Sequence, residues 1–446
     1  MDVTEPAHPT PQAASLATCQ RSLGDRDVAY PLWPPLTAGC RRTSTEQISY
    51  PVEVDYAYER VPRALFSPDA TPSGPPRSAG LDRWAPLLPP LEAPGLGEGG
   101  TPLLELEPGV WVKDESRNPT WSHKDRYNRV AVSAAARIGA PGVVVASTGN
   151  HGASAAAYAA RAGLRCVVFT GEDLPPAVDA FLHAYGAEVL PVPVAARWPL
   201  VRRVVDEFGL HPVSNLTSTH TGHAFGPEGY KTIAYEIHAD LGVPAAVFVP
   251  TGYGELLFGV WKGFAELRRL GVTDRVPVMY ACEPAAGGPL AKALRDGVPA
   301  ANVDVGPTDA YGIACPVGGY RGVVAVRESG GEAILVDNAR LTAARAELAR
   351  AGLWAELSAA AGLAGFRAGR AGGDLPDPDG PVVCVSTSSG FKDRAVGGKS
   401  RTVERTHEGS HERTVERAGA EWPEVYRRLR HAGIAHRAAP GQGRPR

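Results

Sequence analysis

The sequence is poor in the features that mark membrane-spanning, secreted and nucleic-acid-binding proteins. Its 446 residues include only 6 cysteines and carry a formal net charge of −2. No uninterrupted apolar run approaches the roughly 18 residues that span a bilayer, and residues 1–6 lack the basic and apolar segments that open a secretory signal. So small a net charge provides no attraction for nucleic acid or a membrane surface. We therefore expect no nucleic-acid partner and no membrane partner.

The few cysteines also point to a reducing compartment. Several sit in apolar stretches that read as strands or core, where a reduced thiol is the usual state. We accordingly expect a cytoplasmic protein without a disulfide framework. The six positions are Cys19, Cys40, Cys166, Cys282, Cys315 and Cys384.

What the sequence does contain is a series of short apolar runs that alternate with helical segments. The runs at 143–147, 166–169, 245–249 and 381–385 are rich in valine, and an alanine-rich helix is predicted at 153–162. This alternation predicts an α/β fold of mostly parallel sheets covered by helices on both faces. Ligands of such sheets bind beyond the carboxyl ends of the strands.

Composition divides the chain into three parts. Residues 1–80 are rich in Pro, Ser and Thr and predict an irregular N-terminal segment, whereas residues 81–395 form the α/β region. Residues 396–446 are polar, repeat the pentapeptide Arg-Thr-Val-Glu-Arg, and contain a possible short helix at 421–431. Low hydrophobicity predicts a flexible or loosely docked tail.

Lys124 lies in the most informative stretch, residues 113–126, which reads KDESRNPTWSHKDR. Asn118-Pro119 predicts a turn and Ser122 a helix N-cap, so Lys124 falls on the first turn of a helix. The helix dipole disfavours an ammonium there. Taken alone, Lys-Asp-Arg at a helix start is more often a surface charge cluster. Together with the strand that ends in Ser147-Thr148-Gly149-Asn150, it suits a carbonyl cofactor bound to the lysine as a Schiff base.

These motifs resemble the pyridoxal-phosphate (PLP) enzymes of fold type II, the family of threonine synthase, threonine deaminase and the tryptophan synthase β-subunit. The closest resemblance is to threonine synthases, whose pattern is Asn-Pro-Thr-Gly-Ser-Phe-Lys-Asp-Arg. This chain differs from that pattern at Trp121 and His123. The resemblance implies a two-domain catalytic region over residues 81–395, with a smaller lobe at about 125–220 and the rest in a larger lobe. It also implies PLP as cofactor, an amino acid as small-molecule substrate, and possibly a homodimer.

The resemblance also assigns the site residues. Lys124 is expected to be the catalytic residue that forms the imine with the cofactor and transfers protons. The glycine-rich loop before the helix near Leu256 offers backbone N–H groups to a phosphate, although the carboxylate of Glu255 is unfavourable there unless it points away. The expected cofactor-binding set is Lys124, Asn150, Thr251, Gly252, Tyr253, Gly254 and Thr387. The expected substrate-binding set, which holds the carboxylate at a helix N-terminus, is Ser147, Thr148, Gly149, Asn150 and His151.

The N-terminal cysteines resemble half of a zinc ribbon, a module that many threonine-synthase relatives carry. Ser22 and Thr43 stand where the second thiolate of each Cys-x-x-Cys pair belongs. Two cysteines cannot fill a tetrahedral zinc site. The alternative is that they are two unrelated cysteines of a loop-rich segment. We expect no metal in either case.

The reaction remains open between related chemistries. A threonine synthase-like carbon–oxygen lyase would eliminate phosphate from a phosphorylated amino acid and would need a second anion site. His151-Gly152 instead favours a β-eliminating ammonia-lyase, of the threonine/serine dehydratase or diaminopropionate lyase type, or a β-replacement enzyme. Trp121 and His123 are expected to reshape the substrate side of the pocket. Glu255, the incomplete ribbon and the tail also allow a catalytically inactive PLP-binding relative.

Overall fold

The computed structural model describes residues 14–66, 80–171, 174–373, 379–393 and 421–434. Its larger sheet has six strands in the order β12-β11-β10-β13-β5-β4, and all neighbours are parallel except β4 and β5. The strands are β4 (Leu103–Glu107), β5 (Val110–Asp114), β10 (Ala246–Pro250), β11 (Val278–Pro284), β12 (Glu332–Val336) and β13 (Val382–Ser386).

A second sheet has four parallel strands in the order β8-β7-β6-β9. They are β6 (Gly142–Ala146), β7 (Arg165–Thr170), β8 (Glu188–Pro191) and β9 (His211–Pro212). This sheet lies within the range expected for the smaller lobe, and the six-stranded sheet lies outside that range. We propose that the two sheets mark the two lobes of one catalytic region.

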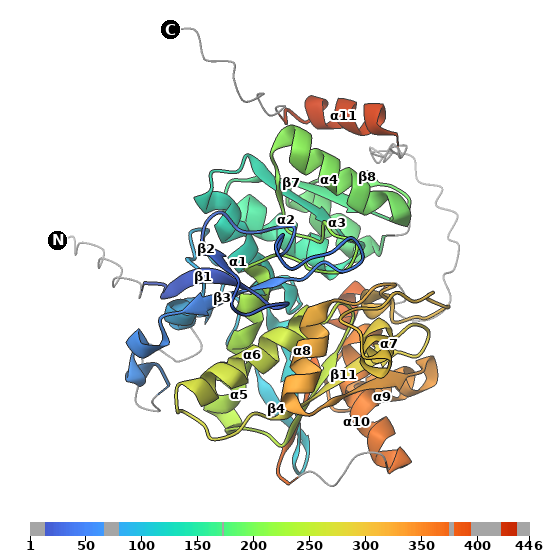
Figure 1. Cartoon of the computed structure of the whole chain (residues 1–446). Helices are drawn as coiled ribbons and strands as arrows, with labels where there is room; N and C mark the ends of the chain where they lie inside the picture. The colour runs from blue at the N-terminus through green and yellow to red at the C-terminus, as the bar shows by residue number, and fades with distance from the viewer. Residues whose placement is uncertain (1–13, 67–79, 172–173, 374–378, 394–420, 435–446) are drawn as a thin grey trace, which may run out of the picture.

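The inner strands of both sheets are buried on both faces, as their valine-rich sequences predict, whereas the edge strands β4 and β12 are partly exposed. In β6, Val143 and Val145 belong to one hydrophobic cluster and Val144 to another. In β10, Val247 belongs to the same cluster as Val143, and Phe248 belongs to a third cluster on the other face of its sheet. Successive side chains of a strand point to opposite faces, so each sheet needs helices on both sides. The predicted α/β class with mostly parallel, doubly covered sheets is confirmed (Figure 1).

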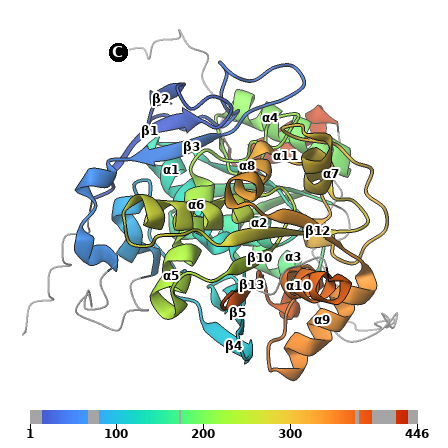
Figure 2. The same ribbon diagram turned by 60° about the horizontal axis from the view of Figure 1, so that its bottom comes forward.

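The helices pack around the sheets in two groups, which Figure 2 shows from a second direction. Helices α1 to α4 lie with the four-stranded sheet, and α5 to α10 lie with the six-stranded sheet. The first group is α1 (Lys124–Arg137), α2 (Asn150–Arg161), α3 (Pro176–Ala184) and α4 (Arg197–Phe208). The second is α5 (Lys231–Leu241), α6 (Glu255–Arg269), α7 (Pro289–Asp296), α8 (Tyr320–Ser329), α9 (Asn338–Arg350) and α10 (Ala361–Gly372).

The N-terminal segment contains a small antiparallel sheet that the sequence did not predict. Its strands are β1 (Ala17–Ser22), β2 (Ala29–Pro31) and β3 (Val52–Tyr56). Ser22 and Thr43, the two residues in place of thiolates, lie side by side with their hydroxyl oxygens 2.9 Å apart. Cys40 is buried next to them and contacts the Tyr30 hydroxyl at 3.2 Å. Within the described ranges, no three His, Cys, Asp or Glu residues are grouped closely enough to hold a metal ion.

Helix α11 (Trp422–His431) agrees with the short helix expected at 421–431. Its Val425 and Leu429 are fully buried in the same cluster as Phe208 of α4, so this part of the polar tail is docked on the four-stranded side. The repeated pentapeptide lies outside the described residues. In the part of the chain that the structure describes, no helix has both the length and the apolar character to cross a membrane.

Candidate active site

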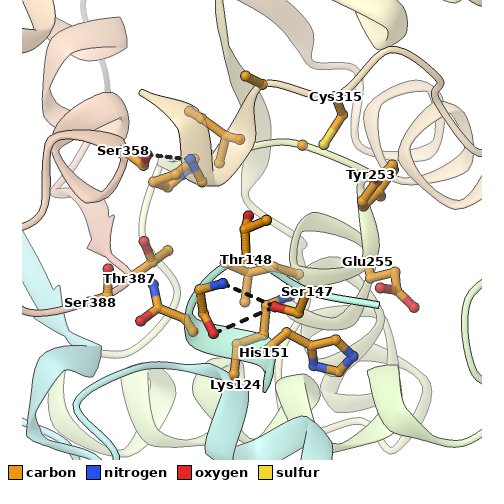
Figure 3. Close-up of a pocket in the computed structure, with 18 of the residues that line it drawn as sticks. Lys124, Ser147, Thr148, His151, Tyr253, Glu255, Cys315, Ser358, Thr387 and Ser388 are labelled. Carbon is orange, nitrogen blue, oxygen red and sulfur yellow. Dashed lines mark hydrogen bonds between the residues drawn. The ribbon is translucent and has the colours of Figure 1, made fainter. Parts of the chain in front are cut away.

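A cavity of about 220 Å³ lies between the two sheets, where loops after β6, β10 and β13 meet the start of α1 (Figure 3). In the view of Figure 3, Thr387 and Ser388 lie on one side, and Tyr253, Glu255 and Cys315 on the other. The structure brings every predicted site residue to this one cavity. Its lining includes Lys124, Ser147, Thr148, Gly149, Asn150, His151, Thr251, Gly252, Tyr253, Gly254 and Thr387.

Lys124 is the first residue of α1, as the turn and cap residues predict. The N-cap position belongs to His123, one residue after the expected Ser122, yet the Ser122 hydroxyl still accepts the Lys124 backbone N–H at 3.1 Å. Burial lowers the pKa of the Lys124 ammonium, and the carboxylate of Glu255 acts against that shift. A lysine with a lowered pKa keeps more of its amine in the neutral form that can act as nucleophile or base.

The lysine loop is joined to the loop after β13 by backbone hydrogen bonds. The His123 backbone N–H donates to the Thr387 carbonyl at 2.9 Å, and the His123 ring Nδ1 lies 3.1 Å from the same oxygen. Burial and the neighbouring Lys124 charge keep the pKa of His123 well below its usual value. The neutral ring therefore carries its proton on Nδ1 and donates it. This contact fixes Thr387 relative to Lys124.

Trp121, the other departure from the threonine synthase pattern, lies outside the cavity. It is 40% exposed and contacts Phe181 at 5.4 Å and Phe391 at 6.0 Å between ring centroids. Its φ of 62° is in the left-handed region, where a side chain costs about 1–2 kcal/mol and glycine is favoured. The expectation that Trp121 reshapes the substrate side of the pocket is thus wrong, whereas His123 does line the cavity.

The second loop places the N-terminus of α2 in the cavity. Ser147 Oγ accepts the backbone N–H groups of Gly149 at 3.2 Å and Gly152 at 2.9 Å, so it shapes the turn. Gly149 caps α2 without a side-chain hydrogen bond, which leaves backbone N–H groups available to an anion. The His151 ring lies 2.8 Å from the Val213 carbonyl through Nε2, and burial lowers its pKa to about 3. His151 is therefore neutral and held in place.

Asn150 joins the two lobes through a carboxylate. Its side-chain Nδ2 donates to Glu356 at 2.7 Å, and the Ser388 hydroxyl donates to the same oxygen at 2.5 Å. Burial raises the pKa of Glu356 although both contacts oppose the shift. The Asn150 Oδ1 atom is buried and has no hydrogen-bond partner among the residues that the structure describes. A buried polar atom of this kind calls for a ligand to complete its hydrogen bonding.

The loop between β10 and α6 has the form of an anion cradle. Gly254 adopts φ +85° and caps α6 without a side-chain hydrogen bond. A Cβ on Gly254 would lie 2.8 Å from Gly322, and one on Gly252 would lie 2.8 Å from the Cys315 sulfur. Position 254 therefore requires glycine, and a side chain at position 252 would displace Cys315. The first N–H groups of α6 have no acceptor within the helix, and the first residues of α6 line the cavity. The Tyr253 ring stacks on His220 with centroids 4.0 Å apart.

Many residues of the cavity lining were not predicted as site residues, among them Glu356, Lys392, Arg197 and His220, whose side chains are ionisable. Glu356 and Lys392 belong to stretches that resemble threonine synthases, and that similarity could have pointed to them. Arg197 and His220 have no such signal, because they follow β8 and β9 in segments without a motif. Burial lowers the pKa of Lys392 to about 8, so this second lysine of the cavity is still mostly charged at pH 7.

Arg126, two residues after Lys124, is wholly buried and is not part of a surface charge cluster. Its guanidinium contacts Glu115 at 2.7 Å and Glu236 at 2.6 Å, and Lys113 contacts Glu236 at 2.7 Å. All four side chains are at most 9% exposed. These two cations and two anions balance one another. They tie the first turn of α1 to β5 and α5.

The sequence is similar to known pyridoxal-phosphate proteins. The family described as "Pyridoxal-phosphate dependent enzyme" matches residues 95–388. A threonine synthase of Methanosarcina acetivorans is 33% identical over 70% of this chain and 80% of its own length. A threonine synthase of Methanocaldococcus jannaschii is 34% identical over 71% of this chain and 82% of its own length.

Solved structures share the fold. An L-serine ammonia-lyase of Rhizomucor miehei has a TM-score of 0.56 at 22% identity and covers 65% of this chain and 93% of its own. The processed form of threonine deaminase isoform 2 of Solanum lycopersicum has a TM-score of 0.54 at 22% identity. It covers 65% of this chain and 79% of its own. Identities this low support the fold alone.

Proposed function

The chain belongs to the family of pyridoxal-phosphate dependent enzymes, and on this premise we propose that it is a lyase of amino-acid metabolism. It catalyses elimination or replacement at the side chain of an amino acid, in the manner of a threonine synthase. The observation that carries the proposal is the cavity in which Lys124 meets the N-termini of α2 and α6.

The cavity fits PLP. The glycine cradle from Thr251 to Gly254 suits the phosphate, since its glycines leave no room for a Cβ. The unpartnered Asn150 Oδ1 lies in the cavity lining, where a ring substituent can reach it, and Thr387 lies near Lys124 through the His123 contact. Lys124 is the residue that binds the cofactor aldehyde. When bound, PLP withdraws electrons from the α-carbon of an amino acid and so makes loss of its proton possible.

The chain's own residues then position the substrate and move the proton. The backbone N–H groups at the start of α2, which Ser147 shapes, bind the substrate carboxylate. Lys124, with its lowered pKa, takes the proton from the substrate α-carbon as a general base and delivers it where the product needs it. His151 is neutral and packs edge-on against Tyr127 with ring centroids 5.1 Å apart, which keeps a further positive charge away from Lys124.

The surroundings of Arg197 support the proposal that the substrate carries an anionic group on its side chain. It lines the cavity, and the hydrogen bond of its guanidinium in the described residues is a long contact of 3.4 Å from Nε to the Val194 carbonyl. No carboxylate of the described ranges lies within 4.0 Å of it. Burial lowers the pKa of its guanidinium, so an anion brought by the substrate would be favourable. A leaving phosphate group, as in a threonine synthase reaction, fits this position.

A β-eliminating ammonia-lyase is the second candidate. His151-Gly152 at the start of α2 resembles the form common in deaminases. The inactive relative has less support, because the Glu255 side chain is directed at Gly222 and not at the glycine cradle.

The test begins with the purified protein supplied with PLP. We expect a visible absorption band that is absent in Lys124→Ala, and borohydride reduction should attach the cofactor to Lys124, as peptide mass spectrometry would show. Absence of cofactor binding in the wild type would refute the proposal.

A panel of amino acids then separates the reactions. Phosphate release from a phosphorylated amino acid would support the synthase-like reaction, and ammonia with keto acid from unphosphorylated serine or threonine would support the ammonia-lyase. Arg197→Ala should raise KM at least tenfold for the phosphorylated substrate only. Arg295→Ala, at an exposed arginine, is the matched control.

Two finer properties belong to the same proposal. We propose a cytoplasmic location, which the six free cysteines support, and a homodimer, which rests on the resemblance alone. Sedimentation analysis of the PLP-bound protein tests the second, and a monomer at micromolar concentration would contradict it.

A further inference from the structure

Glu255 is a buried carboxylate in an unusual place, the first residue of α6 at the phosphate cradle. It is 8% exposed and lines the cavity. Its side chain is directed at Gly222, where a Cβ would lie only 1.9 Å from Glu255 Oε1. Gly222 has φ +60°, so the residue type and the backbone conformation at 222 both accommodate this carboxylate.

One hydroxyl is committed to Glu255. The Tyr127 hydroxyl accepts the His223 backbone N–H at 3.1 Å and lies 3.2 Å from Glu255 Oε1. Since a tyrosine hydroxyl has a single proton, that proton is donated to the carboxylate. Within the described ranges, no side-chain nitrogen of Lys, Arg or His lies within 4.0 Å of Glu255, although the His223 backbone N–H also acts on the carboxylate and lowers its pKa. The carboxylate is therefore hydrogen-bonded without being neutralised by a contact ion pair.

Two buried cations face the carboxylate at longer range, Lys124 and Arg321. Arg321 donates to backbone carbonyls, among them Thr221 and, at 2.5 Å, Val52. Its Nε atom has no partner. The hydrogen bonds of Arg321 thus go to neutral carbonyls, so Arg321 forms no contact ion pair with Glu255 in the described residues. Arg321 has the larger long-range effect on the pKa of Glu255 and Lys124 the smaller one.

In the described residues, no carboxylate lies within 4.0 Å of the Lys124 Nζ atom. Its Nζ lies 5.8 Å from the Tyr127 ring centroid and 5.7 Å from the Tyr230 ring centroid. In the part of the chain that the structure describes, no hydrogen-bond acceptor is in reach of this nitrogen. Glu255 is the carboxylate that acts on it electrostatically. A buried ammonium that faces two aromatic rings needs a nearby negative charge, because the rings restore only part of the stabilisation that hydration would give it.

We propose that Glu255 is the counter-ion of Lys124 and stabilises the ammonium form that Lys124 adopts each time it takes a proton from the substrate. The inference rests on the proposed function, in which Lys124 is the base. The proton itself passes from the substrate carbon to the lysine amine and back, and Glu255 changes only the stability of the charged lysine. Glu255 is accordingly a positioning residue that acts through Lys124.

The other titratable groups around Glu255 do not interfere near neutral pH. Burial keeps the pKa values of His220 and His223 well below the usual histidine value. Burial also raises those of Tyr127 and Tyr230 well above the usual tyrosine value, and the same holds for Tyr253. The groups that can be charged there are Lys124, Glu255 and Arg321.

The experiment measures the proton affinity of Lys124 in the cofactor-free protein. The pH dependence of amine labelling at the Lys124 peptide, followed by mass spectrometry, reports its pKa without any turnover. In Glu255→Gln we expect this pKa to fall by about one unit, which is roughly a tenfold faster labelling rate below the pKa. Glu283→Gln is the matched control. Glu283 is buried but accepts backbone N–H groups of α7 at 3.0 and 2.7 Å, and it should leave Lys124 unchanged.

An unchanged Lys124 pKa in Glu255→Gln, or an equal shift in Glu283→Gln, would overturn the inference. Should Glu255→Gln fail to fold by circular dichroism, Tyr127→Phe removes the hydroxyl that stabilises the carboxylate and should shift Lys124 in the same direction by a smaller amount. The two proposals fail separately. If wild-type protein binds no PLP, the proposed function fails, whereas PLP binding without a Lys124 shift refutes the counter-ion alone.

Discussion

The buried charge cluster around Arg126 allows a quantitative prediction about what holds Lys124 in place. In Glu236→Gln, the four-residue cluster of Lys113, Glu115, Arg126 and Glu236 loses one of its two negative charges. The glutamine amide also presents donors to cations that need acceptors. Removing one partner of a buried ion pair costs about 3–5 kcal/mol, because the remaining charge is left without compensation. We expect that loss in the free energy of unfolding at pH 7.5.

The pH dependence follows from the sign of the pKa shift. Burial alone would raise the pKa of Glu236, but the charges of Arg126 and Lys113 outweigh burial and hold it well below the usual value. A carboxyl whose pKa is depressed in the folded state contributes stability above its unfolded pKa of roughly 4.3 and loses it as the pH falls. The difference between wild type and Glu236→Gln should therefore be largest above pH 5 and shrink toward pH 3.

Urea unfolding of the cofactor-free protein, followed by tryptophan fluorescence, measures the effect without a contribution from ligand binding. Glu107→Gln is the matched control. Glu107 also pairs with an arginine, Arg367, at 2.6 Å, but it is 46% exposed, so its loss should cost at most about 1 kcal/mol. The reasoning is refuted if Glu236→Gln costs no more than Glu107→Gln, or if its cost stays constant down to pH 3.

Three further predictions concern single positions. Trp121→Gly should be more stable to urea than Trp121→Ala by about 1 kcal/mol, because both lose the ring contacts but only glycine relieves φ 62°; equal stability would contradict the strain argument. Gly254→Ala, at φ +85° and with no space beside Gly322, should weaken PLP binding at least tenfold in an equilibrium titration, and wild-type affinity would show that the cradle lies elsewhere. The double variant Ser22→Cys with Thr43→Cys should bind one Co²⁺ with thiolate charge-transfer absorption, since these hydroxyls lie 2.9 Å apart; no such band at stoichiometric cobalt would disprove a ribbon remnant.

Local sequence was enough to predict the elements that carry the core of the site. The valine-rich run at 381–385 is observed as β13 (Val382–Ser386), and Lys124 begins α1 as its turn residues indicate. Each of these features depends on a few consecutive residues, and burial on both sheet faces follows directly from their composition.

Contacts between distant segments could not be predicted in the same way. Glu356 reaches Asn150 across 206 positions, and Arg197 enters the cavity from a segment without a motif. The N-terminal sheet was also missed, since β1 and β3 pair across a long, irregular connection with a register shift between Ala17 and Cys19.

By itself, the sequence determined which segments form the candidate site: a lysine at a helix start, a glycine-rich loop and a Ser-Thr-Gly-Asn turn at a helix N-terminus, each encoded in one short segment. Only the tertiary structure decided how these residues are charged and what surrounds them. It placed Trp121 at the surface, buried Arg126 among carboxylates, and directed Glu255 at Gly222. Burial and long-range electrostatics arise from segments that meet only in the folded chain, so no local pattern can contain them.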